Sequence, residues 1–185
     1  MSDNNIISPS TNPKYWYSFP CSVNSDNVGK FIDFVLGKVH SDISPEFTLY
    51  LSSLGGDMDS AIRFYDFIKA LNLKINTVGY GQVESAAIML FLCGQKRFVH
   101  KDCRLRLHAP RYSGPEQLQV ISVHQEVTTL LQKLDERYFE IIAKETSKKN
   151  SEIRKVYNKG KILVGKEAVD FGFATETVNK LPIFK

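Results

Sequence analysis

The stretch GYGQVESAAIMLFLCG, residues 79–94, decides how the rest of the chain is arranged. It begins with Gly-Tyr-Gly at 79–81, which predicts a tight turn directly after the strand-like segment 74–78. Ser85 then precedes the unbroken apolar run 86–93, which predicts a buried helix. This order places a serine hydroxyl at a helix N-terminus, where free backbone N–H groups favour negative charge on a bound oxygen.

A serine in this position has two interpretations. It can be a plain N-cap, which is the more common role of a lone serine before an apolar run. It can also be a nucleophile, provided that other parts of the chain supply a base and a second donor for an oxyanion. The nucleophile interpretation therefore depends on a base and a second donor elsewhere in the sequence.

Composition indicates a soluble globular protein. The 185 residues and 43% hydrophobic content suit one domain with a sizeable core. The net charge of +4 is small, and Lys and Arg are spread along the chain, so we expect no nucleic-acid partner. We see no signal peptide and no apolar run long enough for a membrane span.

The cysteines point to a reducing compartment. Cys21, Cys93 and Cys103 are odd in number and irregularly spaced, and no CxxC pair is present for zinc or redox chemistry. We therefore expect reduced thiols, no bound metal and a cytoplasmic location.

Hydrophobic periodicity predicts strands alternating with helices. Residues 1–13 are polar and predict a flexible tail, followed by one domain over 14–185. The order β-α-β-α-β-α in the first half implies an α/β fold with a parallel sheet and crossover helices. Strands are expected at 14–21, 47–51, 74–78, 96–99, 104–108, 161–164 and after 175, and shorter helices at 24–40, from 58, 151–158 and 166–171.

One predicted helix is unusually long. Residues 117–144 would span roughly 42 Å at 1.5 Å per residue, which is more than such a domain needs for its own core. The helix either packs on its own domain or projects as an arm that meets another subunit, and its near-heptad rhythm favours the arm. The apolar positions in that rhythm are Val120, Val127, Leu131, Leu134, Tyr138 and Ile141.

Two further pieces complete a possible site for acyl transfer. In the segment 104–108, Leu105 and Leu107 alternate with polar residues, so His108 ends the strand on its polar face. Such a histidine is most often simply solvated, but here it can serve as the base. The Gly55-Gly56 turn allows the close backbone approach that N–H donors to an oxyanion require.

At these residues the chain resembles the Clp protease family, serine peptidases with the ClpP/crotonase fold. The family's SPGG turn corresponds to SLGG at 53–56, and its GQxxSxA nucleophile segment to GQVESAA at 81–87. Its strand ending in His-x-Pro corresponds to LRLHAP at 105–110, and its EAxxxG helix to KEAVDFG at 166–172. The resemblance covers about residues 15–178.

The resemblance implies a role for each matching residue. Ser85 would be the nucleophile, His108 its base, and the N–H groups of Gly56 and Ala86 the oxyanion hole. The long helix, about 117–146, would be the protruding handle that docks two rings face to face. Family members enclose their sites in stacked seven-membered rings, cleave peptides or unfolded proteins without a cofactor, and receive substrates from an AAA+ unfoldase.

The sequence departs from the family at three places. Leu54 replaces the proline of the SPGG turn, which loosens the turn but keeps its glycines. The segment before Trp16 is short and polar and lacks the family's axial segment, which argues against an unfoldase partner. The family's third catalytic residue, an aspartate, corresponds to Val156, and Asn158 is the nearest polar candidate.

Three functions remain open from the sequence. The first is a serine endopeptidase in a homo-oligomeric barrel, weakened by the missing acid. The second is an inactive or weak subunit that contributes structure to a mixed ring with a sister subunit. The third, which ranks last, is a crotonase-type acyl-CoA enzyme, since such enzymes share the fold and the oxyanion hole but need no serine–histidine pair.

Overall fold

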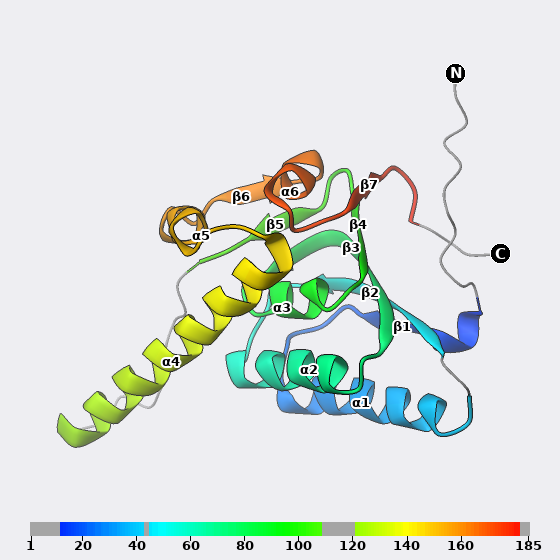
Figure 1. The fold of residues 1–185 in the computed structure, drawn as a ribbon, viewed down its shortest axis with the longest axis horizontal. Helices are drawn as coiled ribbons and strands as arrows, with labels where there is room; N and C mark the ends of the chain where they lie inside the picture. Colours follow the sequence, from blue (N-terminus) through cyan, green and yellow to red (C-terminus); the bar gives the residue numbers. More distant parts are fainter. Residues whose placement is uncertain (1–11, 43–44, 109–120, 182–185) are drawn as a thin grey trace.

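A computed structural model describes residues 12–42, 45–108 and 121–181 of the chain. Within these residues the fold is α/β, with helices packed around a seven-stranded sheet (Figure 1). The strands are β1 (Trp16–Phe19), β2 (Glu46–Ser53), β3 (Lys74–Glu84), β4 (Lys96–His100), β5 (Arg104–Arg106), β6 (Ile162–Val164) and β7 (Glu176–Val178). The helices are α1 (Ser25–Val39), α2 (Met58–Ala70), α3 (Ala87–Leu92), α4 (Ile121–Thr146), α5 (Asn150–Asn158) and α6 (Lys166–Phe171), preceded by a 3₁₀ turn (Pro13–Tyr15).

The sheet has a parallel body with a small branch. Its main path runs β1-β2-β3-β4-β7, and every pair along it is parallel. β5 pairs in parallel with the last residues of β3, and β6 pairs antiparallel with β5. The predicted β-α-β units and parallel sheet are therefore confirmed. Of the predicted tail, residues 1–11 lie outside the described residues, whereas Pro13 begins the 3₁₀ turn.

The predicted turn at 79–81 is wrong, because these residues lie inside β3. β3 is eleven residues long and continues to Glu84. Its pairing with β2 changes register between Leu51 and Ser53, and Gly81 has a φ of +63°. The glycine thus allows a bend within a continuing strand, as in a β-bulge, and does not reverse the chain. This extension carries β3 far enough to pair with β5 as well as β4.

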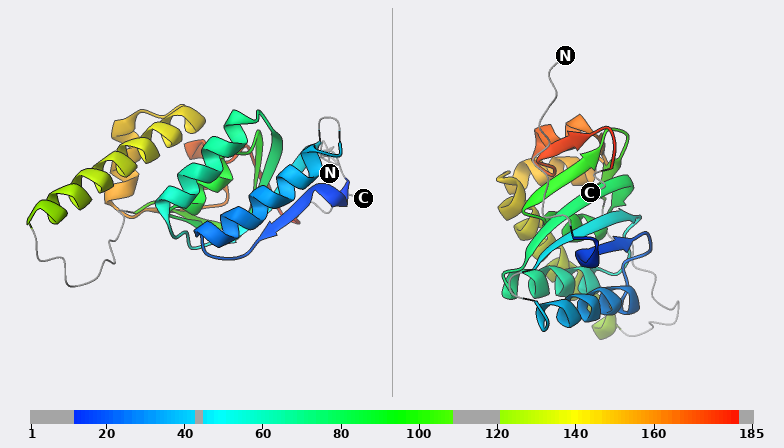
Figure 2. Two further views of the ribbon diagram at one scale, coloured as in Figure 1. Left: turned by 90° about the horizontal axis from the view of Figure 1, so that it is seen from below. Right: turned by 90° about the vertical axis from the view of Figure 1, so that its right-hand side faces the viewer.

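The core lies between the sheet and the helices. All six residues of α3 are buried, as the unbroken apolar run predicts. The Thr77 hydroxyl donates a 2.8 Å hydrogen bond to the Phe91 carbonyl, which attaches α3 to β3. The two helices α1 and α2 lie side by side beneath the sheet (Figures 1 and 2).

The long helix α4 serves the core at one end and projects at the other. Its first part extends away from the rest of the molecule (Figures 1 and 2). Tyr138 and Ile141, which were expected to belong to an intersubunit face, are buried in the chain's own core. Leu131 and Leu134, nearer the projecting end, are half-buried. Residues 117–120 of the predicted helix lie outside the described residues.

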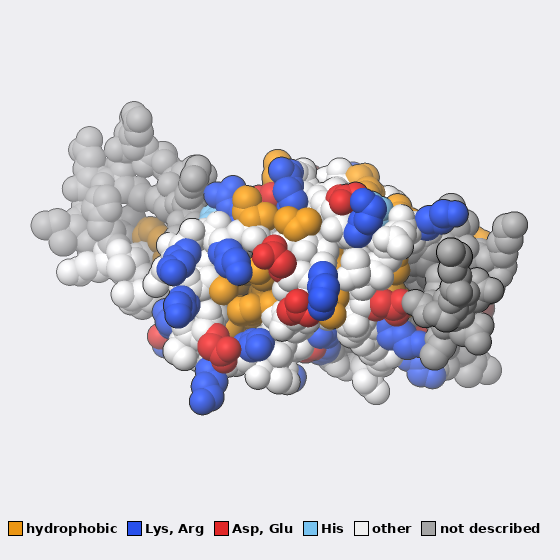
Figure 3. All heavy atoms as spheres, turned by 90° about the horizontal axis from the view of Figure 1, so that it is seen from above, with side chains coloured by type: hydrophobic (Ala, Val, Ile, Leu, Met, Phe, Trp, Pro, Cys, Tyr) orange, Lys and Arg blue, Asp and Glu red, His pale blue; other side chains and the backbone are white. Residues whose placement is uncertain are grey.

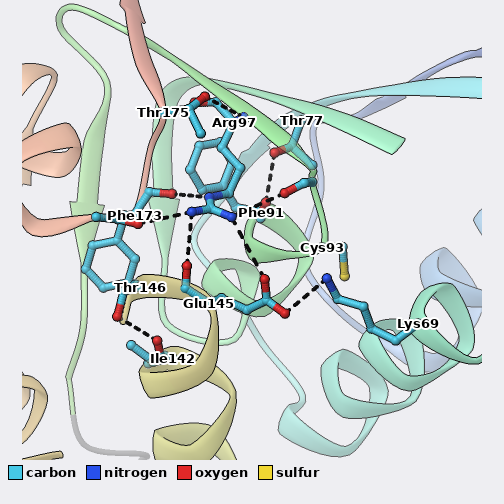
Figure 4. A network of polar contacts seen from close by, with 12 residues as sticks. Lys69, Thr77, Phe91, Cys93, Arg97, Ile142, Glu145, Thr146, Phe173 and Thr175 are labelled. Atoms are coloured by element: carbon cyan, nitrogen blue, oxygen red, sulfur yellow. Dashed lines mark hydrogen bonds and ion pairs between the residues drawn. The ribbon is translucent and has the colours of Figure 1, made fainter. Parts of the chain in front are cut away.

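A carboxylate near the end of α4 fixes this helix to the body of the molecule (Figure 4). The Glu145 carboxylate accepts a hydrogen bond from the Tyr65 hydroxyl at 2.5 Å and lies 3.0 Å from the Lys69 ammonium. The Arg97 guanidinium of β4 donates to the Glu145 carbonyl at 3.1 Å and to the Phe173 carbonyl at 2.6 Å. These bonds join α2, α4, β4 and the segment after α6, so the base of the projecting helix is held on several sides.

The face of the molecule seen from above carries mixed charge. In the view from above, basic side chains are interspersed with acidic ones and with small apolar patches (Figure 3). Among the described helices, none is long and apolar enough to cross a membrane. The three cysteines are unpaired, which confirms the prediction of free thiols. Burial raises the pKa of the Cys103 thiol to about 12, so this thiol stays protonated at neutral pH.

Candidate active site

Ser85 lies in a strained turn where β3 ends and α3 begins. Its φ is +54°, in the left-handed region that costs an ordinary L-residue about 1–2 kcal/mol. The N-cap of α3 is Ala86, and no side chain caps that helix end. The N-cap interpretation of Ser85 is therefore wrong. A serine on a strained strand-to-helix turn is instead typical of an exposed nucleophile.

Hydrogen bonds from three elements to the backbone of Ser85 fix this turn. The Ser85 N–H donates to the Arg106 carbonyl of β5 at 2.8 Å. The Ser85 carbonyl accepts from the Ile88 N–H of α3 at 3.0 Å and from the Tyr138 hydroxyl of α4 at 3.1 Å. The Ser85 side chain is half-exposed, and its hydroxyl makes no hydrogen bond within the described residues. The backbone is thus held firmly while the hydroxyl remains accessible.

His108 reaches the same edge of the sheet through the pairing of β5 with β3. Glu84 is the register partner of Arg106, so Ser85 lies one residue beyond the paired ends and His108 two. Carboxyl ends of neighbouring parallel strands meet at one sheet edge, which is where α/β proteins bind ligands. β5 is shorter than predicted, and His108 follows it with a half-exposed side chain while Leu107 is fully buried.

The glycine turn after β2 lies directly against Ser85. A Cβ on Gly55 would be 2.6 Å from the Glu84 carbonyl oxygen and 2.7 Å from the Ser85 Cβ, and the φ of Gly55 is +94°. Only glycine fits such a position. A Cβ on Gly56 would be 2.2 Å from the Val23 carbonyl oxygen, so the second glycine is also required, by a different neighbour.

Two backbone N–H groups near Ser85 have no hydrogen-bond acceptor among the described residues. Within the described residues, neither the Gly56 N–H nor the Ala86 N–H donates a hydrogen bond. The Gly55 N–H, in contrast, donates to the Ser53 hydroxyl at 3.1 Å. Because the glycine turn packs on the Ser85 turn, these two unbonded donors belong to adjoining segments. Paired N–H groups of this kind can stabilise the oxyanion of a tetrahedral intermediate.

The candidates for a third catalytic residue lie on α5. Val156 is half-buried and packs against the hydrophobic core, and its hydrocarbon side chain has no atom that could accept a hydrogen bond. Asn158 is the last residue of α5, with an exposed side chain that makes no hydrogen bond within the described residues. The position that corresponds to the family's aspartate therefore supplies no carboxylate.

Sequence reasoning missed two polar pairs beside the site. The Glu84 carboxylate, one residue before Ser85, lies 3.7 Å from the Arg106 guanidinium. The Tyr157 hydroxyl donates to the Asp135 carboxylate at 2.9 Å. Strand alternation in two adjacent strands could have predicted the first pair. No sequence signal joins Asp135 to Tyr157, since α4 and α5 meet through tertiary packing.

Tyr138 was also missed as a polar residue, because its position in the near-heptad rhythm predicts only an apolar contact. Its ring lies 6.2 Å from that of Phe139 and 6.3 Å from that of Tyr157. Burial raises the pKa of Tyr138 well above its usual range, and burial together with Asp135 does the same for Tyr157. Both hydroxyls therefore stay protonated and act as hydrogen-bond donors. Among the described residues, no cluster of ligands suits a metal ion.

Comparison with known proteins identifies the family. The sequence model of the Clp protease family matches residues 23–180. The chain belongs to the Clp protease family. The proteolytic subunit 2 of the ATP-dependent Clp protease of Frankia casuarinae is 30% identical over 139 residues, which cover 74% of this chain and 63% of the relative. The corresponding subunit 2 of Mycobacterium tuberculosis is 31% identical over 133 residues, covering 71% of this chain and 62% of the relative.

The fold is likewise that of a solved relative. A point mutant of ClpP1 from Listeria monocytogenes superposes with a TM-score of 0.79 at 23% identity, covering 93% of this chain and 95% of that one. The expected ClpP-like fold is therefore confirmed. The chain spans less than two thirds of the length of the curated relatives named above. Activity, substrates and partners of those relatives are accordingly matters of proposal for this Clp protease family member.

Proposed function

We propose that this chain is a serine endopeptidase of the Clp type that hydrolyses peptides or unfolded proteins. The observation that carries the proposal is the strained Ser85 turn, packed on Gly55-Gly56 and adjoining the end of the strand that leads to His108. Membership of a protease family supports it. The same three features answer the three needs of acyl transfer, which are a nucleophile, a base and an oxyanion hole.

The chemistry follows from these positions. His108 accepts the proton of the Ser85 hydroxyl as the oxygen attacks the carbonyl carbon of a peptide bond. The Gly56 and Ala86 N–H groups donate to the oxygen that becomes negative. The protonated His108 then gives its proton to the leaving amine, and water releases the acyl group by the reverse sequence of steps. No cofactor takes part in these reaction steps.

The position of the family's acid has consequences for the rate, because Val156 cannot orient the histidine. In a trypsin-type protease, replacing the triad aspartate by asparagine lowers the rate by about 10⁴. Asn158 is our candidate for a weak substitute, because an amide oxygen can accept from the imidazole N–H but carries no charge. We accordingly expect turnover slower by on the order of 10²–10⁴ than that of a relative with the acid.

Val156 also supports a second candidate function, a weakly active or inactive subunit that completes a mixed ring with a sister subunit. In either case we propose an oligomer of stacked rings, with α4 as the handle between rings. The three free thiols suit a reducing, cytoplasmic compartment.

Hydrolysis of an unstructured fluorogenic peptide by the isolated protein tests the proposal. We expect slow cleavage that is abolished in Ser85→Ala and reduced at least ~100-fold in His108→Ala, each compared with wild type at equal oligomer concentration. A peptidase activity that survives in Ser85→Ala would show that the nucleophile lies elsewhere. Activity that appears only when a sister subunit is added would instead favour the mixed ring.

A further inference from the structure

Tyr138 reaches the proposed nucleophile turn from a distant part of the chain. Its hydroxyl donates to the Ser85 carbonyl oxygen at 3.1 Å, across 53 residues of sequence. The side chain is 1% exposed, and its ring packs with Phe139 and Tyr157 in the core. A residue of the long helix α4 thus contacts the backbone of Ser85 itself.

The bonded carbonyl belongs to a peptide unit with a second role. The Ser85 C=O and the Ala86 N–H are parts of one planar peptide, and in a trans peptide they point in opposite directions. A donor that holds the oxygen on the protein side therefore directs the N–H to the other side. That N–H is one of the two donors beside Ser85 that make no hydrogen bond within the described residues. Hydrogen bonding at the carbonyl also polarises the peptide and strengthens its N–H as a donor.

The hydrogen bond from Tyr138 to the Ser85 carbonyl does more than satisfy a buried tyrosine hydroxyl. Any buried tyrosine hydroxyl is expected to find an acceptor, and most acceptors have no further function. Here the acceptor lies in a turn with a positive φ and already receives the Ile88 N–H at 3.0 Å. Tyr157 provides the contrasting case, because its ring is in the same aromatic group but its hydroxyl donates to Asp135.

We infer that Tyr138 is a positioning residue, whose hydroxyl aims and polarises the Ala86 N–H for the oxyanion. The inference rests on the proposed serine peptidase function. It assigns to α4 a direct part in the site, beyond any role in assembly. Because Tyr138 does not touch substrate, it acts through the peptide between Ser85 and Ala86.

The test compares Tyr138→Phe with the matched variant Tyr157→Phe, each of which loses one hydroxyl from the same aromatic group. A fluorophosphonate probe places its phosphonyl oxygen in the oxyanion hole when it reacts with serine, so its maximal labelling rate reports on that hole. We expect Tyr138→Phe to lower this maximal rate about 10-fold with little change in the probe's half-saturating concentration. Tyr157→Phe is expected to keep the maximal rate within about 2-fold of wild type, because its hydroxyl does not contact the Ser85 peptide.

Hydrogen exchange gives a readout that does not depend on catalysis. The peptide covering residues 85–88 should take up deuterium faster in Tyr138→Phe than in wild type, whereas Tyr157→Phe should leave this uptake unchanged. Equal labelling rates and equal exchange in Tyr138→Phe and wild type would overturn the inference while leaving the peptidase proposal standing. Equal losses of rate in both variants would also overturn it, because they would indicate a purely structural role. If Ser85 of wild type fails to react at all, the proposed function fails and the inference fails with it.

Discussion

The Glu84 carboxylate lies 3.7 Å from the Arg106 guanidinium. Glu84 directly precedes the proposed nucleophile Ser85, and Arg106 lies two residues before the proposed base His108. The Glu84 side chain is 10% exposed, whereas that of Arg106 is 36% exposed. Glu84 is therefore the more buried partner, and its negative charge is compensated by Arg106. This ion pair joins β3 to β5 at the point where both strands enter the site.

Removing only Arg106 from this pair should destabilise the protein more than removing both Glu84 and Arg106. Arg106→Ala leaves the Glu84 carboxylate buried without a partner, which we expect to cost about 1–3 kcal/mol of folding free energy. The double variant Glu84→Ala/Arg106→Ala should recover at least half of that loss. Thermal or denaturant unfolding of the four proteins in a double-mutant cycle measures it. A single variant as stable as wild type would show that the pair contributes nothing.

Buried thiols should make the protein sensitive to alkali. Burial raises the pKa of Cys103 from 9.0 to about 12, and it also raises the pKa of the fully buried Cys93 thiol. The folded state therefore favours the protonated thiol. The stability that comes with burying this protonated thiol is complete below pH 9 and is lost as pH rises from 9 toward 12. Each thiol would cost up to about 1.4 kcal/mol per pH unit. Between about pH 9 and 10, the melting temperature of Cys103→Ala should fall less steeply than that of wild type, and parallel curves would contradict this.

The strand and helix order could be predicted from sequence because hydrophobic periodicity reports directly which residues face the core. The α3 segment is the clearest case, since its six consecutive buried residues are all apolar and stand out as an unbroken apolar run. The turn at 79–81 was mispredicted because glycine also supplies a positive φ inside a bent strand, as Gly81 does. The choice between turn and bend depends on pairing with β2 and β5, which local sequence does not contain.

For the candidate site, short sequence motifs identify residues whose position depends on the local backbone. They do not identify residues that reach the site from distant helices. Ser85, His108 and the glycine turn lie in recognisable segments, and the structure brings Gly55 against Ser85. Tyr138 could not be found in this way, because a heptad position predicts burial and says nothing of what its hydroxyl meets. The same holds for Asp135 and Tyr157, which meet only through the packing of α4 on α5.

The projecting part of α4 should form an intersubunit contact. Leu131 and Leu134 are half-buried in the single chain, while Tyr138 and Ile141 already belong to its core. A charge in an apolar interface lacks a partner, so Leu131→Asp should dissociate the particle into smaller species. Leu36→Asp, at an exposed position of α1, is a matched control that should not. Sedimentation that finds wild type already monomeric would contradict the handle assignment.

Restoring an acid should strengthen the site if Val156 has been aligned correctly. Val156→Asp is expected to raise the rate of Ser85 labelling about 10-fold or more, because a carboxylate orients the imidazole and stabilises its charged form. Val156→Asn provides the control of similar size without charge, and Asn158→Ala should lower the rate. A Val156→Asp protein that folds and assembles but labels at the wild-type rate would show that this position does not face His108.

The proposed function requires Ser85 to react as a nucleophile, and mass spectrometric mapping of a fluorophosphonate adduct shows whether it does. The reaction is carried out on the native oligomer, which is then digested, and the modified residue is identified in the peptide that contains 81–87. We predict one adduct per chain, located on Ser85, absent in Ser85→Ala and formed more slowly in His108→Ala. An adduct on another serine, or an unmodified Ser85 in a folded and assembled protein at saturating probe, would show that Ser85 is not the nucleophile.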